Sequence, residues 1–424
     1  MTTLTQNVQR GGRYRGVAAA AILFVGVVVA AMPRTLSMFR HAASEAPAPA
    51  LMPGVGMPGG PQTSADGLQG RVREMEARLQ TQPRDLAASV LLADALLRVS
   101  RATTDARPAG RAAEVLTAAL SDAPGAYDAL RLLGAIDLSL HRFRDALDVG
   151  QRARDLRPDD AWNYGVIGDA HLELGNYDEA FAAFEQMMQR RPNAAAYARV
   201  AYARELTGDV EGALIAMETA FSASPVTDPE AQAWYATQVG ELLLRLNRLD
   251  DADREFRRAV FLYPQYPLAR VGSGKVLAAR GDAKGALAIF VDQLSRTPTL
   301  DLAARIGDLH RADGRTSEAE HYYQLAEELA GPSATQTEAA VALFLADHDR
   351  KVPEAVAIAE AVVRNRSDIA SEHALAWAYF KAGMLTKASA AMDRATRTGS
   401  RDPLLLAHAA TIRDAEARRA AAAQ

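Results

Sequence analysis

The stretch of this chain that comes closest to a chemical motif is residues 272–275, which read GSGK. A phosphate-binding loop has the pattern G-x4-G-K-[ST], in which glycine amides cradle phosphates, the lysine contacts them and the hydroxyl reaches Mg²⁺. Here Ala269 replaces the first glycine and Val276 replaces the hydroxyl residue. Ser273 also lies outside a G-x-S-x-G turn, the pattern that carries the nucleophile of many hydrolases. We therefore expect neither nucleotide binding nor hydrolase chemistry here.

The eight histidines are scattered, and none forms an H-x3-H or H-E-x2-H pair of the kind that binds zinc. The densest cluster is residues 347–349 (DHD), which we interpret as a surface turn rather than a metal site. The chain has no cysteine, which excludes disulfides, Cys–zinc sites, iron–sulfur clusters and thiol catalysis. The sequence thus predicts no catalytic residue, no metal ligand and no cofactor.

The composition indicates a helical protein with a sizeable core. Hydrophobic residues make up 49% of the 424 residues and charged residues 24%, which excludes global disorder. Aromatic residues make up only 6%, and alanine is abundant, a balance that favours closely packed helices over a β-sandwich. The net charge of −4 excludes a strongly basic nucleic-acid binder.

An uncharged apolar run, residues 17–32, follows a polar start that carries Arg10, Arg13 and Arg15, and Pro33 ends it. As a helix the run would be about 24 Å long, slightly short of a hydrocarbon core of about 30 Å. We expect a cytoplasmic tail at 1–16 and a transmembrane helix at 17–32, followed by a Pro/Gly-rich disordered linker at 33–70.

Three interpretations of the apolar run compete. A retained signal anchor is favoured, because the run is long for a signal peptide and Pro33 lies close behind the best cleavage site. A cleaved signal peptide would use Val29 and Ala31 as the small residues before the cut. A buried soluble helix is the third. We expect a single-pass protein of a bacterial inner membrane with residues 33–424 on the periplasmic side, or a secreted or periplasmic protein after cleavage.

The rest of the chain repeats with a period of about 34 residues. Alanines recur in one register at spacings of 34, 34, 33, 39, 34, 33, 36 and 33 residues; they are Ala112, Ala146, Ala180, Ala213, Ala252, Ala286, Ala319, Ala355 and Ala388. Other positions keep step with them. A Gly or Ala stands twelve residues before most of these alanines, a Gly or Asn five before, a bulky residue four after and a proline twelve after.

Each repeat unit reads as two antiparallel helices. The small residue of the first helix and the alanine of the second allow close approach, the Gly or Asn permits a positive φ in the turn, and the proline ends the unit. One such pair cannot bury its apolar face alone, so the units must stack into a solenoid.

This pattern resembles the tetratricopeptide repeat (TPR) family, whose motif is W-x2-L-G-x2-Y, then A-x3-F-x2-A, then P. The third unit matches best, with Gly168, Ala180, Phe184 and Pro192 at the motif positions. The resemblance implies an all-α solenoid of about nine helix pairs over 86–403. We expect a capping helix before it, 71–85, and a C-terminal capping helix after it, 404–424, with Asp402 as N-cap.

In TPR solenoids the first helices line a concave face, and the resemblance implies a peptide-binding groove there. Projecting the inward motif positions onto this chain gives aromatic anchors and a mainly acidic wall; the candidates are Trp162, Asp169, Tyr202, Glu205, Trp234, Glu241, Lys275, Asp308, Phe344 and Trp377. Asp347 is projected inward as well. An alternative is that the aromatics are packing residues and the acids only solvate the face. The positions that grip a chaperone carboxylate in some TPR domains hold Ala135, Asp169, Tyr202 and Glu241, which do not fit that clamp.

The sequence therefore predicts a non-catalytic scaffold that binds protein or peptide segments and not nucleic acid, attached to a membrane through its N-terminal helix. We expect a role in assembling a bacterial envelope complex, because 43 Arg against 5 Lys is consistent with a GC-rich bacterial genome. Residues 71–98 are similar to the entry into TPR domains of cytochrome c biogenesis proteins, which implies a chaperone of that type as one alternative. A structural, self-assembling protein is another.

Overall fold

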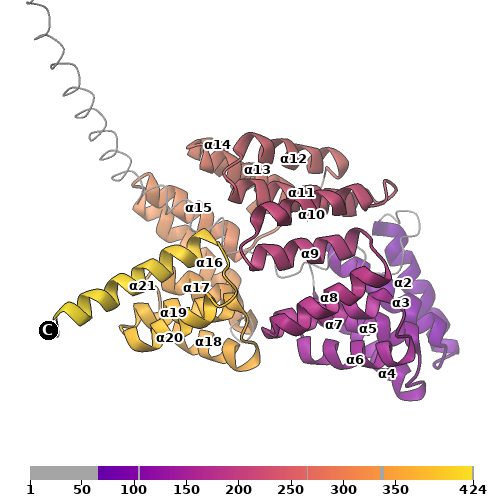
Figure 1. Ribbon diagram of the computed structural model, residues 1–424. Coiled ribbons are helices and arrows are strands. Elements are labelled where there is room, and N and C mark those ends of the chain that lie inside the picture. The colour runs from indigo at the N-terminus through magenta and orange to yellow at the C-terminus, as the bar shows by residue number, and fades with distance from the viewer. Residues whose placement is uncertain (1–64, 104–105, 265, 335–338, 423–424) are drawn as a thin grey trace, which may run out of the picture.

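The computed structural model describes residues 65–103, 106–264, 266–334 and 339–422, and every regular element in these ranges is an α-helix (Figure 1). The helices succeed one another at short intervals; they are α2 (Ala65–Thr81), α3 (Leu86–Thr103), α4 (Ala106–Asp122), α5 (Tyr127–Ser139), α6 (Phe143–Leu156), α7 (Ala161–Leu174), α8 (Tyr177–Arg190), α9 (Ala194–Leu206), α10 (Val210–Ala223), α11 (Pro229–Arg245), α12 (Leu249–Leu262), α13 (Pro267–Ala279), α14 (Ala283–Arg296), α15 (Leu300–Ala312), α16 (Thr316–Ala334), α17 (Ala339–Asp347), α18 (Val352–Asn365), α19 (Ile369–Lys381), α20 (Leu385–Ala395) and α21 (Pro403–Ala422).

From α3 to α20 these helices form antiparallel pairs, which we number as units one (α3, α4) to nine (α19, α20). Each helix packs on the next one along the chain over most of this length, as stacked pairs must to bury their apolar faces. The predicted all-α solenoid is therefore confirmed, while the predicted transmembrane helix and linker lie outside the described residues up to 64.

The recurrent small residues pack as their spacing predicts. The nine alanines in register are at most 2% exposed. A Cβ atom on Gly168 would lie 2.4 Å from the ring of Phe184 in the partner helix, so only glycine leaves room for the ring. The GSGK run has the same explanation, because Gly272 faces the ring of Phe256 and Gly274 that of Phe290.

The turns inside the units use left-handed backbone, mostly at the predicted position. Gly175 and Gly208 have φ of 83° and 85°, and Asn247 has φ of 56°. Units two and eight place His141 and Asp349 in this region, at φ of 57° and 54°. These two non-glycine residues carry backbone strain that the neighbouring helices must hold.

Two further helices flank the nine units. Helix α2 begins before the predicted capping helix and packs on α3. At the other end the Asp402 carboxylate accepts a hydrogen bond from the Leu405 amide at 2.9 Å, which makes it the N-cap of α21 as predicted.

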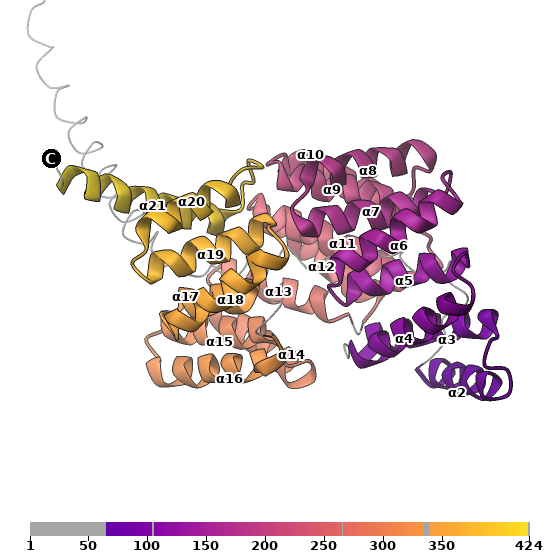
Figure 2. The same ribbon diagram turned by 90° about the horizontal axis from the view of Figure 1, so that it is seen from below.

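The coil closes on itself. The loop between α18 and α19 and the loop between α20 and α21 return to the turns of units two to four, so the C-terminal helices lie beside α7 to α9 (Figure 1, Figure 2). We call this contact between residues 366–402 and the earlier units the seam.

The predicted location in a bacterial inner membrane is contradicted. Among the described residues, no helix combines the length and the apolar character that a bilayer crossing needs. The helices bury their apolar residues against neighbouring units. The predicted membrane segment itself, 17–32, lies outside the described residues.

Candidate functional site

The first helices of the units form the inner layer of the solenoid. Helices α5, α7 and α11 are buried around most of their circumference, whereas α6 and α12 bury one face only. All ten predicted groove residues lie on first helices: Trp162 and Asp169 on α7, Tyr202 and Glu205 on α9, Trp234 and Glu241 on α11, Lys275 on α13, Asp308 on α15, Phe344 on α17 and Trp377 on α19.

The five predicted aromatic anchors fall into two groups. Trp234, Phe344 and Trp377 are buried, with 6%, 3% and 4% of their surface exposed. Trp162 and Tyr202 are half-buried. Of the five predicted anchors, these two residues are therefore the more accessible.

All three tryptophans have well-defined ring neighbours. The Arg131 guanidinium lies 4.4 Å from the ring centroid of Trp162, and Trp377 stacks on His408 with ring centroids 3.5 Å apart. Trp234 packs edge-on against Tyr235. The three indole Nε1–H groups are buried and have no hydrogen-bond acceptor among the described residues.

Acidic side chains predicted to line the inner face are paired with cations from neighbouring first helices. The Asp169 carboxylate pairs with the guanidinium of Arg199 on the next first helix, and its Oδ1 accepts from Nε at 2.9 Å. Both side chains are buried, and burial raises the pKa of Asp169 while Arg199 opposes that shift. Breaking such a pair leaves one buried charge uncompensated, at a cost of about 3–5 kcal/mol.

Two similar pairs continue along the inner layer. Glu205 meets Arg245 at 3.0 Å, and Glu241 meets Lys275 at 3.0 Å, each pair joining one first helix to the next. Burial raises the pKa of Glu205 although Arg245 counteracts it. Each of these acids therefore has a cation beside it, and the inner face does not present a row of unmatched carboxylates.

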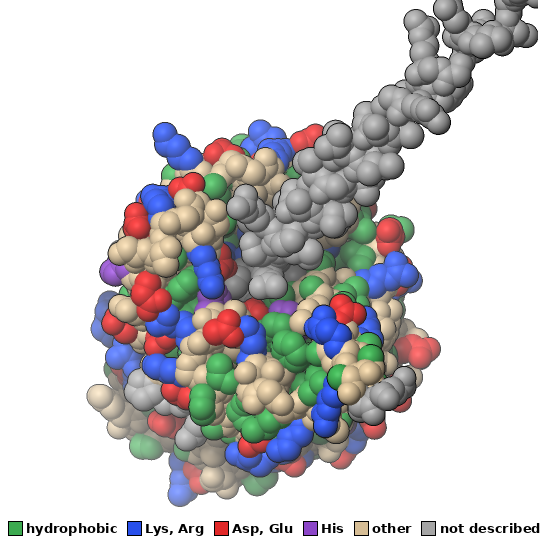
Figure 3. Space-filling model, turned by 90° about the vertical axis from the view of Figure 1, so that its left-hand side faces the viewer, with side chains coloured by type: hydrophobic (Ala, Val, Ile, Leu, Met, Phe, Trp, Pro, Cys, Tyr) green, Lys and Arg blue, Asp and Glu red, His purple; other side chains and the backbone are tan. Residues whose placement is uncertain are grey.

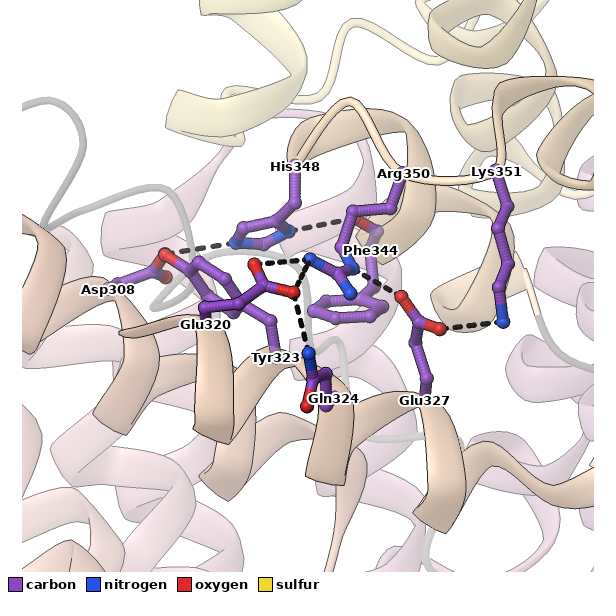
Figure 4. A network of polar contacts seen from close by, with 9 residues as sticks. All are labelled: Asp308, Glu320, Tyr323, Gln324, Glu327, Phe344, His348, Arg350 and Lys351. Atoms are coloured by element: carbon purple, nitrogen blue, oxygen red, sulfur yellow. Dashed lines mark hydrogen bonds and ion pairs between the residues drawn. The ribbon is translucent and has the colours of Figure 1, made fainter. Parts of the chain in front are cut away.

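Asp308 belongs to a polar network at the junction of units seven and eight (Figure 4). Its Oδ1 accepts a hydrogen bond from the Tyr323 hydroxyl at 2.8 Å and lies 3.0 Å from Nε2 of His348. Nδ1 of His348 lies 2.7 Å from the Phe344 carbonyl oxygen, so both ring nitrogens face acceptors.

The same junction is closed by Arg350. Its Nη1 donates to Glu320 at 2.7 Å, and its Nε donates to Glu327, which also accepts from Lys351 at 2.6 Å (Figure 4). These contacts tie the turn after α17 to α16. Lys351, which lies in this turn, has a left-handed backbone with a φ of 42°.

A third buried cluster holds the C-terminal helix. Nε2 of His408 on α21 lies 3.2 Å from Oδ1 of Asp347, and its Nδ1 lies 2.9 Å from Nε2 of His373 on α19. Burial lowers the pKa of His373 to about 3, with the His408 ring adding to the effect. Asp347, projected inward from the sequence, thus contacts α21.

Charges of both signs are interspersed over the face shown in Figure 3, with hydrophobic side chains between them. An apolar hollow of about 310 Å³ lies elsewhere, between α8 and α9, with Phe181, Met188 and Val200 in its wall.

The comparisons with known proteins agree with this architecture. The sequence profile of the tetratricopeptide repeat family matches residues 166–226 and 240–299, which span units three to six. Each matched stretch begins within a first helix and ends in the loop after the second helix of the next unit. The chain is a tetratricopeptide repeat protein.

Individual relatives match over different lengths. The chain is 40% identical over 55 residues to the Hsp70-Hsp90 organizing protein of Triticum aestivum, and these residues are 13% of this chain and 10% of that protein. The human IFIT1 dimer with m7Gppp-AAAA superposes with a TM-score of 0.52 at 15% identity, covering 78% of this chain and 77% of that chain. A solved tetratricopeptide repeat protein from Parabacteroides merdae has a TM-score of 0.42 at 17% identity, covering 57% and 94%. At such identities the likeness to IFIT1 shows the fold alone.

Tetratricopeptide repeat proteins are generally non-catalytic scaffolds for protein interactions, and the repeats here support that role. Within the described ranges, no group of three or more His, Asp and Glu side chains is arranged to hold a metal ion.

Sequence reasoning missed the cations of this tetratricopeptide repeat protein that neutralise its inner acids. Arg199 and Arg245 stand 30 and 40 residues after Asp169 and Glu205, close to one repeat period. A search for opposite charges one period apart on successive first helices would have found these pairs.

Proposed function

We propose that this tetratricopeptide repeat protein is a scaffold that binds an extended segment of a partner protein against its inner face, with Trp162 and Tyr202 as the aromatic anchors. The observation that carries the proposal is their place on two successive first helices, α7 and α9, where each ring is half-buried. Aromatic side chains held in this way are typical binding hot spots.

The tryptophan donors support a peptide ligand in particular. Buried Nε1–H groups of Trp162 and Trp234 lack acceptors among the described residues. A buried donor without a partner costs about 1–3 kcal/mol. If binding moves the side chains that cover Trp162, a backbone carbonyl oxygen of the segment would accept from its Nε1–H and recover part of that cost.

The charge pairs narrow the class of segment. Because Asp169, Glu205 and Glu241 each have a cation beside them, the inner face has no large unmatched negative field. We therefore propose a segment that is recognised through apolar and aromatic side chains rather than a strongly basic one. On this proposal Trp234, Phe344 and Trp377 support the layer that positions the two accessible anchors.

Replacing Trp162 by alanine tests the proposal. Peptides are first selected on the wild-type protein from a phage-displayed random library, and their affinity is then measured by fluorescence anisotropy. We expect Trp162→Ala to weaken binding about tenfold or more, since a hot-spot aromatic contributes about 2 kcal/mol.

Phe261 provides the matched control, because its ring is 84% exposed on a second helix, α12. Phe261→Ala should leave the affinity unchanged while removing a comparable aromatic surface. Unchanged affinity in Trp162→Ala, with helicity retained by circular dichroism, would remove the inner face as the binding site.

The sequence also predicted finer roles. Assembly of an envelope complex was inferred from the predicted membrane anchor and the Arg-rich composition, and a cytochrome c biogenesis type of chaperone from residues 71–98. Self-assembly is distinguishable by a mass that rises with protein concentration in analytical ultracentrifugation.

A further inference from the structure

The seam joins parts of the chain that are almost two hundred residues apart. At the turn of unit three, a Cβ atom on Gly175 would lie 2.6 Å from the carbonyl oxygen of Ser367, and at the turn of unit four one on Gly208 would lie 2.5 Å from that of Gly399. Glycine at both turns therefore permits backbone-to-backbone contact across the seam.

Arginine side chains from the C-terminal loops hold the seam. Nη1 of Arg366 lies 2.9 Å from Glu173 at the end of α7, and its guanidinium also approaches the Phe143 ring of unit two. Nη2 of Arg397 donates to the Ser367 carbonyl oxygen at 2.6 Å and to that of Gly175 at 3.3 Å.

A second set of contacts lies along the same seam. The Tyr177 hydroxyl accepts a hydrogen bond from the Ile369 amide at 2.8 Å, and Ile369 packs into the apolar cluster around Tyr177 and Phe184. Asp402 lies 3.4 Å from Arg245, which is also the partner of Glu205 on the inner face. Arg245 thus links the seam directly to the inner layer.

The seam is not needed for the stacking of the units. In a solenoid each unit is stabilised by its neighbours in sequence. The stacked units are therefore already folded without contacts between distant units. The contacts of the seam are largely polar, like those of interfaces between mobile domains.

Burial opposes the central ion pair of the seam. Burial raises the pKa of Glu173 to about 8, with Asp368 adding to the effect and Arg366 opposing it. Desolvation therefore opposes the attraction between Glu173 and Arg366, as is common for buried ion pairs.

We propose that the seam is a latch, which opens when units eight and nine move away from units two to five and which regulates access of a partner segment to the inner face. In the closed coil, residues 366–402 lie against the turns of units three and four. Opening these contacts would make the inner face easier for a partner segment to reach. The effect on access of a partner segment rests on the proposed function, whereas the opening of the latch is measured without a ligand.

Pulsed electron paramagnetic resonance measures the opening directly, because the chain contains no cysteine and accepts two introduced labels. Asp178→Cys on α8 and Ala370→Cys on α19 are exposed positions on opposite sides of the seam. A second labelled pair, Asp178→Cys with Arg144→Cys on α6, does not cross the seam and serves as reference.

For the wild type we expect one short distance across the seam and a longer component that grows as salt is raised to about 1 M, where ion pairs are screened. The variant Arg366→Glu/Arg397→Glu should shift most molecules to the longer distance. Arg364→Glu, a single substitution of the same type at an exposed site on α18, should not. The reference pair should keep its distance in all of them.

A single short distance in the wild type at every salt concentration, or in Arg366→Glu/Arg397→Glu with helicity retained, would overturn the latch. If the double variant loses helicity, Tyr177→Phe removes one hydrogen bond of the seam and should increase the longer component at moderate salt. An unchanged distribution in that variant also counts against the latch.

The consequence for binding is tested separately. In Arg366→Glu/Arg397→Glu the selected peptides, displayed within a loop of a carrier protein, should associate several-fold faster than with the wild type. If the seam opens but the association rate is unchanged, the opening is confirmed and only the regulation of access is refuted. Peptides that bind no form of the protein refute the proposed function and leave the distance result standing.

Discussion

At the residue scale, the fold rests on contacts between a glycine of one helix and an aromatic ring of the next. Gly168 and Phe184 show the principle, since even a methyl group on the glycine would meet the ring. We expect Gly168→Ala to lower the free energy of unfolding by about 1–3 kcal/mol through overpacking, measured by urea denaturation.

Gly110 provides the contrast within the same chain. It lies inside helix α4, and a Cβ atom added there would meet no atom within 4 Å. Gly110→Ala should therefore raise stability by about 0.5–1 kcal/mol through helix propensity alone. A loss in Gly168→Ala no larger than the change in Gly110→Ala would refute the packing explanation.

The sequence was most informative about residues of this kind. The period of the alanines and glycines predicted their burial, because small residues recur only where helices approach closely. It was less informative about side chains that meet across units. Trp234 and Trp377 occupy inward positions and were predicted as anchors, yet the structure buries both, since neighbouring rings such as Tyr235 and His408 fill the space around them.

At the scale of elements, the docking of α21 depends on an imidazole that burial keeps neutral. His373 hydrogen-bonds His408 of α21, and burial lowers its pKa to about 3 from an ordinary value of 6.5. Between these two pH values the unfolded chain binds a proton on this residue that the folded chain does not. Stability is therefore full above pH 6.5 and is lost as the pH falls toward 3, at up to about 1.4 kcal/mol per pH unit.

His373→Gln keeps a hydrogen-bond donor toward His408 but removes the titration. We expect the free energy of unfolding, measured with urea, to differ less between pH 7 and pH 5 in this variant than in the wild type. The reason is that the variant takes up about one proton fewer on unfolding. Equal pH dependence in the two proteins would show that His373 does not control the docking of α21.

Among the elements, the helix pairs were predictable and some turns were not. Gly175 and Gly208 indicated their turns through their type and register. His141 and Asp349 adopt the same left-handed backbone although neither is a glycine. The turn at residues 347–349 was predicted from its DHD sequence, whereas nothing in the repeat pattern indicated the turn at His141.

At the scale of the whole molecule, the closure of the coil could not be predicted from the repeat pattern. A repeat encodes how one unit packs on the next, whereas the seam depends on the accumulated rotation over several units and on residues that break the pattern, such as Arg366 and Arg397. The location of the protein was likewise inferred from the apolar run at residues 17–32, its flanking arginines and the Arg-rich composition, and no described helix supports it.

The central claim is that the inner face of the closed coil binds a protein segment beside Trp162 and Tyr202. Site-specific photo-crosslinking in cells tests it most directly, with a benzophenone amino acid placed at Tyr202 in one protein and at the exposed Phe261 in another. We predict that Tyr202 crosslinks to a discrete partner, that Trp162→Ala abolishes this product, and that Phe261 gives none. The same partner crosslinked from Phe261 and not from Tyr202 would contradict the account.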